Sequence, residues 1–146
     1  MSWLPKKCVL VPVDFSPGAF AALDAAFQFV AEPRQLHVVY VLPTLEPAEP
    51  GVIWATIDND SRQHHAILAL RERLAANKYA DVQLHIAFGD PGHEIVDLAA
   101  KLAAELIVLP SHGRTGLTRI LLGSVAERVV RLAHCPVLVL KDLTIS

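Results

Sequence analysis

The apolar run Leu106-Ile107-Val108-Leu109 and the loop Gly113-Arg114-Thr115-Gly116-Leu117-Thr118-Arg119-Ile120-Leu121-Leu122-Gly123-Ser124 decide the fold. The run is typical of a buried strand, and an amphipathic helix is predicted from Val125 to about Ala133. Between a strand and a helix, a glycine-bearing loop leaves backbone N–H groups unblocked at the positive end of the helix dipole. The stretch therefore predicts an α/β fold in which this loop can hold a phosphate.

The rest of the chain repeats the alternation of strand and helix. We predict further strands at 8–13, 36–42, 82–88 and 136–140, and further helices at 17–30, at 60–78 and from Pro91 onward. Apolar and polar residues alternate at the start of the third strand, as at a sheet edge. The order predicts a single doubly wound five-stranded parallel sheet with helices on both faces. Because ligands bind such sheets at strand carboxyl ends, we expect Asp14, Val41 and the loop from Ser111 to Ser124 to converge.

Composition favours a globular protein without a membrane span or a basic surface. Of 146 residues, 53% are hydrophobic and 19% charged, and the formal net charge is −2, so nucleic-acid binding is not indicated. No apolar run approaches the roughly 18 residues of a transmembrane helix. The two cysteines indicate no disulfide framework. We expect one cytoplasmic domain that spans residues 1–146.

Several segments together resemble the universal stress protein family over essentially the whole chain. They are Val11-Pro12-Val13-Asp14-Phe15-Ser16, Ala104-Glu105-Leu106-Ile107-Val108, Ser111-His112-Gly113, Gly123-Ser124, Val125-Ala126-Glu127-Arg128-Val129 and Cys135-Pro136-Val137-Leu138-Val139. Their order and spacing are specific for the family and less specific for what a member does. The resemblance implies the adenine nucleotide alpha hydrolase-like fold and a homodimer paired through the last strand, Pro136-Leu140.

The resemblance also implies an ATP site, because some members of the family carry the pattern Gly-x-x-Gly-(nine residues)-Gly-Ser/Thr. Gly113, Gly123 and Ser124 match it, whereas Pro110 stands at the first glycine. Asp14 matches an aspartate near the ribose or a metal, so Mg²⁺ can accompany ATP, and Val41 matches the residue beside the adenine. The implied nucleotide-binding residues are Pro12, Asp14, Val41, Leu109, Ser111, Gly113, Gly123, Ser124 and Val125.

Each of the main site residues also has a structural interpretation. Gly113 and Gly123 can serve a tight loop, and Asp14 can cap the turn after the first strand. Ser124 and Glu127 fit a capping box for the last helix. Pro110 has no N–H, so it removes a hydrogen bond worth roughly 0.5–1.5 kcal/mol or obstructs the nucleotide outright.

The sequence offers little to support dedicated catalysis or a metal site. It has no Gly-Lys-Ser/Thr loop, no Gly-x-Ser-x-Gly motif and no histidine, cysteine and carboxylate cluster with ligand spacing. At most, slow ATP hydrolysis is compatible with it. Two functions stay open: a regulatory stress-response dimer that binds ATP, and a dimeric scaffold that works without a nucleotide.

Overall fold

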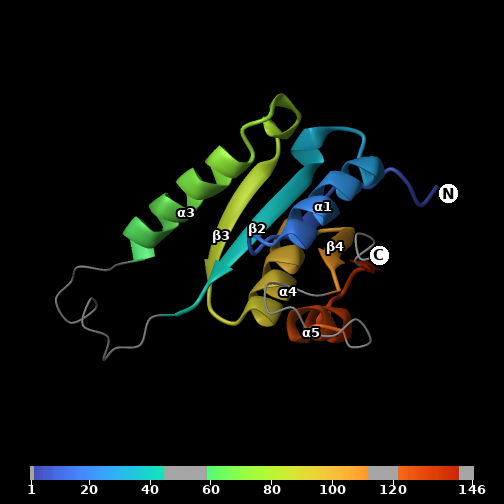
Figure 1. Cartoon of the computed structure of the whole chain (residues 1–146). Coiled ribbons are helices and arrows are strands. Elements are labelled where there is room, and N and C mark those ends of the chain that lie inside the picture. Colours follow the sequence, from blue (N-terminus) through green and yellow to red (C-terminus); the bar gives the residue numbers. More distant parts are fainter. Residues whose placement is uncertain (1, 45–58, 112–121, 142–146) are drawn as a thin grey trace.

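The computed structural model describes residues 2–44, 59–111 and 122–141 (Figure 1). Strands and helices alternate along the chain in the expected order. The strands are β1 (Val9–Pro12), β2 (Leu36–Leu42), β3 (Gln83–Phe88), β4 (Leu106–Pro110) and β5 (Val137–Leu140). The helices are α1 (Pro17–Ala26), α3 (Asn59–Arg73), α4 (Pro91–Leu102) and α5 (Ser124–Leu132).

The five strands form one parallel sheet in the order β3-β2-β1-β4-β5. β3 lies at one edge, as its alternating sequence predicts, and β5 lies at the other. The chain winds outward from β1 in one direction and then returns to β4 on its other side. The strand order therefore reverses between β1 and β4, and a ligand site is expected at their carboxyl ends.

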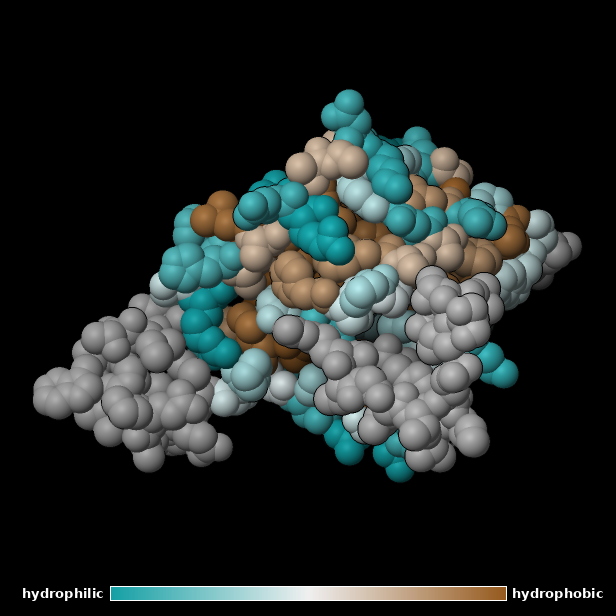
Figure 2. All heavy atoms as spheres, in the orientation of Figure 1, coloured by the Kyte–Doolittle hydropathy of each residue, from teal (hydrophilic) through white to brown (hydrophobic). Residues whose placement is uncertain are grey.

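Two apolar layers bury the sheet on both faces, so the predicted doubly wound fold is confirmed. One core contains Leu23 of α1 and Leu70 of α3, and the other contains Ile95 of α4 and Val129 of α5. All four side chains are at most 1% exposed. In the space-filling view, hydrophobic residues run through the middle of the visible face, and hydrophilic residues lie above and beside them (Figure 2).

Two helices begin as their sequences predict. Ser16 Oγ accepts a hydrogen bond from Ala19 N–H at 3.3 Å, and Asp90 Oδ2 accepts one from His93 N–H at 3.1 Å. Each of these caps precedes a proline at the first helical position, where a missing N–H costs nothing.

Two predicted helices end earlier than their sequences suggest. α1 stops at Ala26, and a 3₁₀ turn covers Phe27–Phe29, where the Phe29 carbonyl accepts a hydrogen bond from Lys6 N–H at 2.6 Å. α3 stops at Arg73, and after the 3₁₀ turn Pro33–Gln35 a third such turn, Asn77–Tyr79, places Tyr79 against Phe27. In both cases tertiary contacts override local helix propensity. No helix in the described part of the chain has the length and apolar character to cross a bilayer.

Candidate functional site

Two prolines face each other where β1 and β4 separate. Val13 N–H donates to the Val39 carbonyl of β2, and Ser111 N–H donates to the Leu140 carbonyl of β5, each at 2.8 Å. Successive residues of a strand direct their backbone groups to opposite neighbours, so the nitrogens of Pro12 and Pro110 face the gap between β1 and β4. Because proline has no N–H, neither residue can extend the ladder between these strands.

The paired register between β1 and β4 is correspondingly short. It joins Val9 to Leu106 and Leu10 to Ile107 and goes no further, whereas β1 stays paired with β2 through Pro12. A cavity of about 240 Å³ occupies the resulting crevice. The described residues that line it are Pro12, Val13, Asp14, Ala19, Val39, Val41, Pro91, Ile95, Leu109, Pro110, Ser111, Gly123, Ser124, Val125 and Ala126.

The structure gathers residues from distant parts of the sequence around this cavity. Eight of the nine residues that the sequence implicates line it: Pro12, Asp14, Val41, Leu109, Ser111, Gly123, Ser124 and Val125. The ninth, Gly113, lies outside the described residues. One ligand in this cavity could therefore contact all eight residues.

Asp14 lies in the turn between β1 and α1 and lines the cavity. Asp14 Oδ1 accepts a hydrogen bond from Ser16 N–H at 3.1 Å, so the side chain does cap this turn. Phe15 between them has φ 65°, a left-handed conformation that is strained for a bulky residue. Its ring packs edge-on against Phe20 and Tyr40, with centroids 5.9 and 5.0 Å away. Aromatic packing thus holds the strained turn beside the cavity.

The predicted capping box at Ser124 is wrong. Gly123 is the N-cap of α5, Ser124 is already its first helical residue, and no side chain caps the helix. The reason is tertiary: Gly123 N–H donates to the Ser111 carbonyl at 2.7 Å, and the Gly123 carbonyl accepts from Glu127 N–H at 2.9 Å. These two bonds make Gly123 the N-cap, with φ −62° and ψ 155°.

The N-terminus of α5 lies at the cavity and has no capping side chain. α1 and α4 have capping side chains, whereas the first N–H groups of α5, at Ser124 and Val125, have no partner within their helix. Asp14 is the only charged residue among the described lining residues. The site thus combines apolar walls, one carboxylate and one helix N-terminus that suits an anion.

A hydrogen-bonded ion pair fixes α4 against α5 near the cavity. Arg128 Nη1 of α5 lies 2.8 and 2.9 Å from the two carboxylate oxygens of Asp90. The hydrogen bonds from His93, followed by those from Arg128, lower the pKa of Asp90 to about 2. Among the described residues, no group of three or more His, Cys, Asp or Glu side chains is placed to hold a metal ion.

Sequence reasoning missed the part of the cavity that α4 contributes. Pro91 and Ile95 line it, together with Val39 of β2 and Ala126 of α5. A usable signal was present, because Asp90-Pro91 opens a helix directly after β3. The first residues of α4 therefore lie at the carboxyl ends of the strands, where β1 and β4 also end.

Comparison with known proteins gives matches along nearly the whole chain. The model of the Universal stress protein family matches residues 6–141. Universal stress protein MJ0531 of Methanocaldococcus jannaschii is 39% identical over 142 residues, which cover 92% of this chain and 82% of that protein. Universal stress protein YxiE of Bacillus subtilis is 31% identical over 144 residues, which cover 91% and 97%.

Solved structures of the same kind share the architecture. UspA from Lactobacillus plantarum superposes with a TM-score of 0.69 at 30% identity, over 92% of this chain and 97% of that one. The hypothetical protein MJ0577 of Methanocaldococcus jannaschii gives 0.75 at 28% identity, over 97% and 100%. A universal stress protein solved in complex with cAMP gives 0.65 at 24% identity, over 93% and 97%, and supports the shared fold alone. On the family match and these relatives, the chain belongs to the universal stress protein family.

Proposed function

We propose that this protein is a regulatory module that binds an adenine nucleotide of the ATP type in the cavity between β1 and β4. One observation carries the proposal: residues from β1, β2, β4 and α5 that the family's nucleotide motif implicates line a single cavity. The site lies where the strand order reverses, the usual ligand position in an open α/β sheet.

The chemistry of the cavity suits the parts of a nucleotide differently. The apolar side chains of Val39, Val41 and Leu109 offer a dry surface to a flat base. The Asp14 carboxylate can accept from a ribose hydroxyl or hold Mg²⁺ through water. The first N–H groups of α5, at Ser124 and Val125, can donate to a phosphate.

Binding would act as a signal rather than as the start of a dedicated reaction. Among the described lining residues, Asp14 is the only titratable group. A nucleotide that binds one conformation more tightly than another shifts the population of the two, which a partner protein can detect. We propose that the working form is a cytoplasmic homodimer paired through β5.

Titration calorimetry of the purified protein with Mg-ATP tests this function directly. We expect a micromolar dissociation constant, and Asp14→Ala and Ser124→Pro to weaken it. Ser124→Pro removes one helix-terminal N–H at a position where proline is tolerated. Titrations with ADP, AMP and cAMP rank the phosphate requirement.

Pro110→Gly is the informative companion variant. It supplies an N–H that faces the gap between β1 and β4, so we expect ATP affinity to rise up to about tenfold. Pro33→Gly, in a 3₁₀ turn that does not line the cavity, is the matched control and leaves affinity unchanged. Absence of binding by the native chain and by Pro110→Gly would refute the nucleotide site.

The same Pro110 supports a second candidate, a dimeric stress or scaffold protein that works without a nucleotide. Its nitrogen faces the crevice without a donor, where the family's ATP pattern has glycine. If Pro110→Gly binds Mg-ATP and the native chain does not, the fold has kept the cradle and lost the ligand, and this second function replaces the first.

A further inference from the structure

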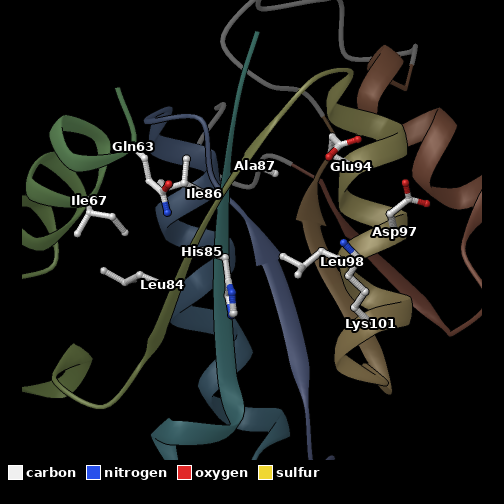
Figure 3. A pocket seen from close by; sticks show the side chains of 10 residues that line it. All are labelled: Gln63, Ile67, Leu84, His85, Ile86, Ala87, Glu94, Asp97, Leu98 and Lys101. Atoms are coloured by element: carbon white, nitrogen blue, oxygen red, sulfur yellow. The ribbon is translucent and has the colours of Figure 1, made fainter. Parts of the chain in front are cut away.

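A groove separate from the β1–β4 cavity runs along the free edge of β3, between α3 and α4 (Figure 3). Its volume is about 350 Å³. Leu84 and Ile86 of β3 lie on the side of α3, where Gln63 and Ile67 form the wall. On the other side, α4 supplies the wall and His85 belongs to the floor; the α4 residues are Glu94, Asp97, Leu98 and Lys101.

The floor of this groove is a row of backbone groups without a partner strand. Among the described residues, β3 pairs only with β2. Gly89 N–H donates to the Leu42 carbonyl at 2.8 Å, so odd-numbered residues of β3 direct their backbone groups to β2. The N–H and C=O groups of Leu84, Ile86 and Phe88 therefore point away from the sheet, and no hydrogen bond within the described residues uses them.

This edge lacks the features that usually prevent strand addition. Gln83–Phe88 contains no proline and no lysine, aspartate or glutamate, and the strand is the longest after β2. Soluble proteins normally protect an exposed edge with charges, prolines or bulges. An unprotected edge with free N–H and C=O groups is a template for another extended segment.

The walls specify which side chains that segment should carry. On the α3 side, Ile67, Leu84 and Ile86 are half-buried and offer apolar contacts. On the α4 side, Glu94 and Asp97 form no ion pair with the described residues, and together with Lys101 they leave this wall with a net charge of −1. A segment that alternates apolar and basic residues would place one kind on each wall, because successive side chains of a strand point to opposite faces.

We propose that the β3 groove binds an extended segment of a partner protein, with alternating apolar and basic residues, as a sixth strand of the sheet. A single strand suits the groove better than a second copy of this domain, because α3 and α4 wall the edge on both sides. A copy would bring its own pair of helices against these walls. The inference is independent of nucleotide binding.

A hexapeptide of alternating lysine and valine, acetylated and amidated at its ends, is the probe. Nuclear magnetic resonance of the native protein should show saturable binding with a dissociation constant of roughly 100 μM. Amide hydrogen exchange should slow at Leu84, Ile86 and Phe88, whereas His85 and Ala87, which already bond to β2, should change little. A peptide with glutamate in place of lysine should bind at least tenfold more weakly.

Backbone N-methylation separates strand addition from simple charge attraction. One alternate set of peptide nitrogens faces β3, and the other set faces solvent. Methylating the inward set should weaken binding at least tenfold, and methylating the outward set should leave it unchanged. If methylation of the lysine nitrogens weakens binding, the added strand has one direction relative to β3, and if methylation of the valine nitrogens does so, it has the other. The experiment therefore also shows whether the added strand is parallel or antiparallel.

Variants of the protein test the acidic wall. Asp97→Asn combined with Glu94→Gln should weaken the lysine peptide several-fold and reduce its salt dependence, with Glu72→Gln, an exposed residue on the face of α3 opposite Gln63, as control. Equal effects of the two methylation patterns, equal binding of the acidic peptide, or exchange protection outside β3 would each overturn the proposal.

Discussion

At the scale of single residues, His85, which lines the groove, contacts a second imidazole on β2. His37 Nδ1 and His85 Nε2, on the neighbouring strands β2 and β3, are 2.9 Å apart, and their rings stack with centroids 5.1 Å apart. One nitrogen of such a contact must accept, so the two rings cannot both be charged while it lasts. Burial, and then the nearby His85, lowers the pKa of His37, and burial lowers the pKa of His85.

This pair predicts a loss of stability in mild acid. Because both pKa values are below the ordinary 6.5, the unfolded chain binds protons more readily than the folded one. The neutral histidine pair therefore contributes fully to the free energy of unfolding above about pH 6.5, and this contribution declines as the pH falls below that value.

Urea unfolding between pH 8 and pH 5 measures the effect of the pair. We expect the native midpoint to fall with acid, and the fall to be smaller in His37→Gln/His85→Gln. His64→Gln, on the exposed surface of α3, should keep the native dependence. Identical slopes for the native protein and the double variant would show that other groups cause the acid sensitivity.

Gly92 is a second residue whose role a sequence alone would misjudge. A Cβ atom at this position would lie 2.6, 2.7 and 2.9 Å from Cδ, Cγ and Cβ of Arg128. Glycine to alanine in a helix usually stabilises by about 0.5–1 kcal/mol. Here we expect Gly92→Ala to lower the free energy of unfolding by about 1–3 kcal/mol, because α5 must move.

Chemical denaturation of Gly92→Ala in two backgrounds checks this sign. In Arg128→Ala, two of the three close contacts are removed, so the cost of the alanine should shrink markedly. A stabilising effect of Gly92→Ala in the native background would mean that α4 and α5 have room between them.

At the scale of secondary-structure elements, Asp90 joins the two helices that frame the cavity. Its carboxylate caps α4 and binds Arg128 of α5. Asn caps a helix about as well as Asp, so Asp90→Asn removes mainly the charge. Since this pair is close to half exposed, we expect a loss of about 0.2–1 kcal/mol at neutral pH.

The pH dependence identifies that contribution. The pKa of Asp90 is depressed from 3.8 to about 2, so the charge stabilises the fold above pH 3.8 and loses this effect as the pH falls toward 2. The difference in urea midpoint between the native protein and Asp90→Asn should therefore disappear over that range. A difference that persists unchanged at pH 2 would contradict the assignment to the charge.

The elements themselves were largely predictable, whereas their ends and neighbours were not. Apolar runs and the proline-marked caps at Ser16 and Asp90 predict the five strands and four helices of the described residues, because these signals are local in the chain. The sequence predicts Ser124 as the cap of α5, whereas Gly123 is the cap, because the bond between Gly123 and Ser111 is tertiary. Two other features of the cavity depend on the order of the strands, which the periodicity of the sequence does not encode. They are the place of Pro91 in its wall and the orientation of Pro12 and Pro110 toward the gap between β1 and β4.

At the scale of the whole molecule, the sheet has two edges with different surroundings. β3 lies in a groove walled by α3 and α4, which suits one added strand. β5 is a four-residue edge of Val137, Leu138, Val139 and Leu140, each half-buried and none of them charged. An exposed apolar edge of this kind is normally protected, and the proposed homodimer would cover it with a second copy of β5.

The proposed dimer can be tested at one backbone nitrogen. The Leu140 carbonyl accepts from Ser111 N–H, so the alternate residues Val137 and Val139 direct their backbone groups to the free side of β5. Val139→Pro removes an N–H on that side and leaves the bonds between β4 and β5 in place. Light scattering should give twice the chain mass for the native protein and for Val139→Ala, and the single chain mass for Val139→Pro. Ile86→Pro, at the opposite edge, should remain dimeric while it loses the lysine peptide, so the two edges are separable. A monomeric native protein, or a Val139→Pro variant that stays dimeric and folded, would place the second copy elsewhere than at β5.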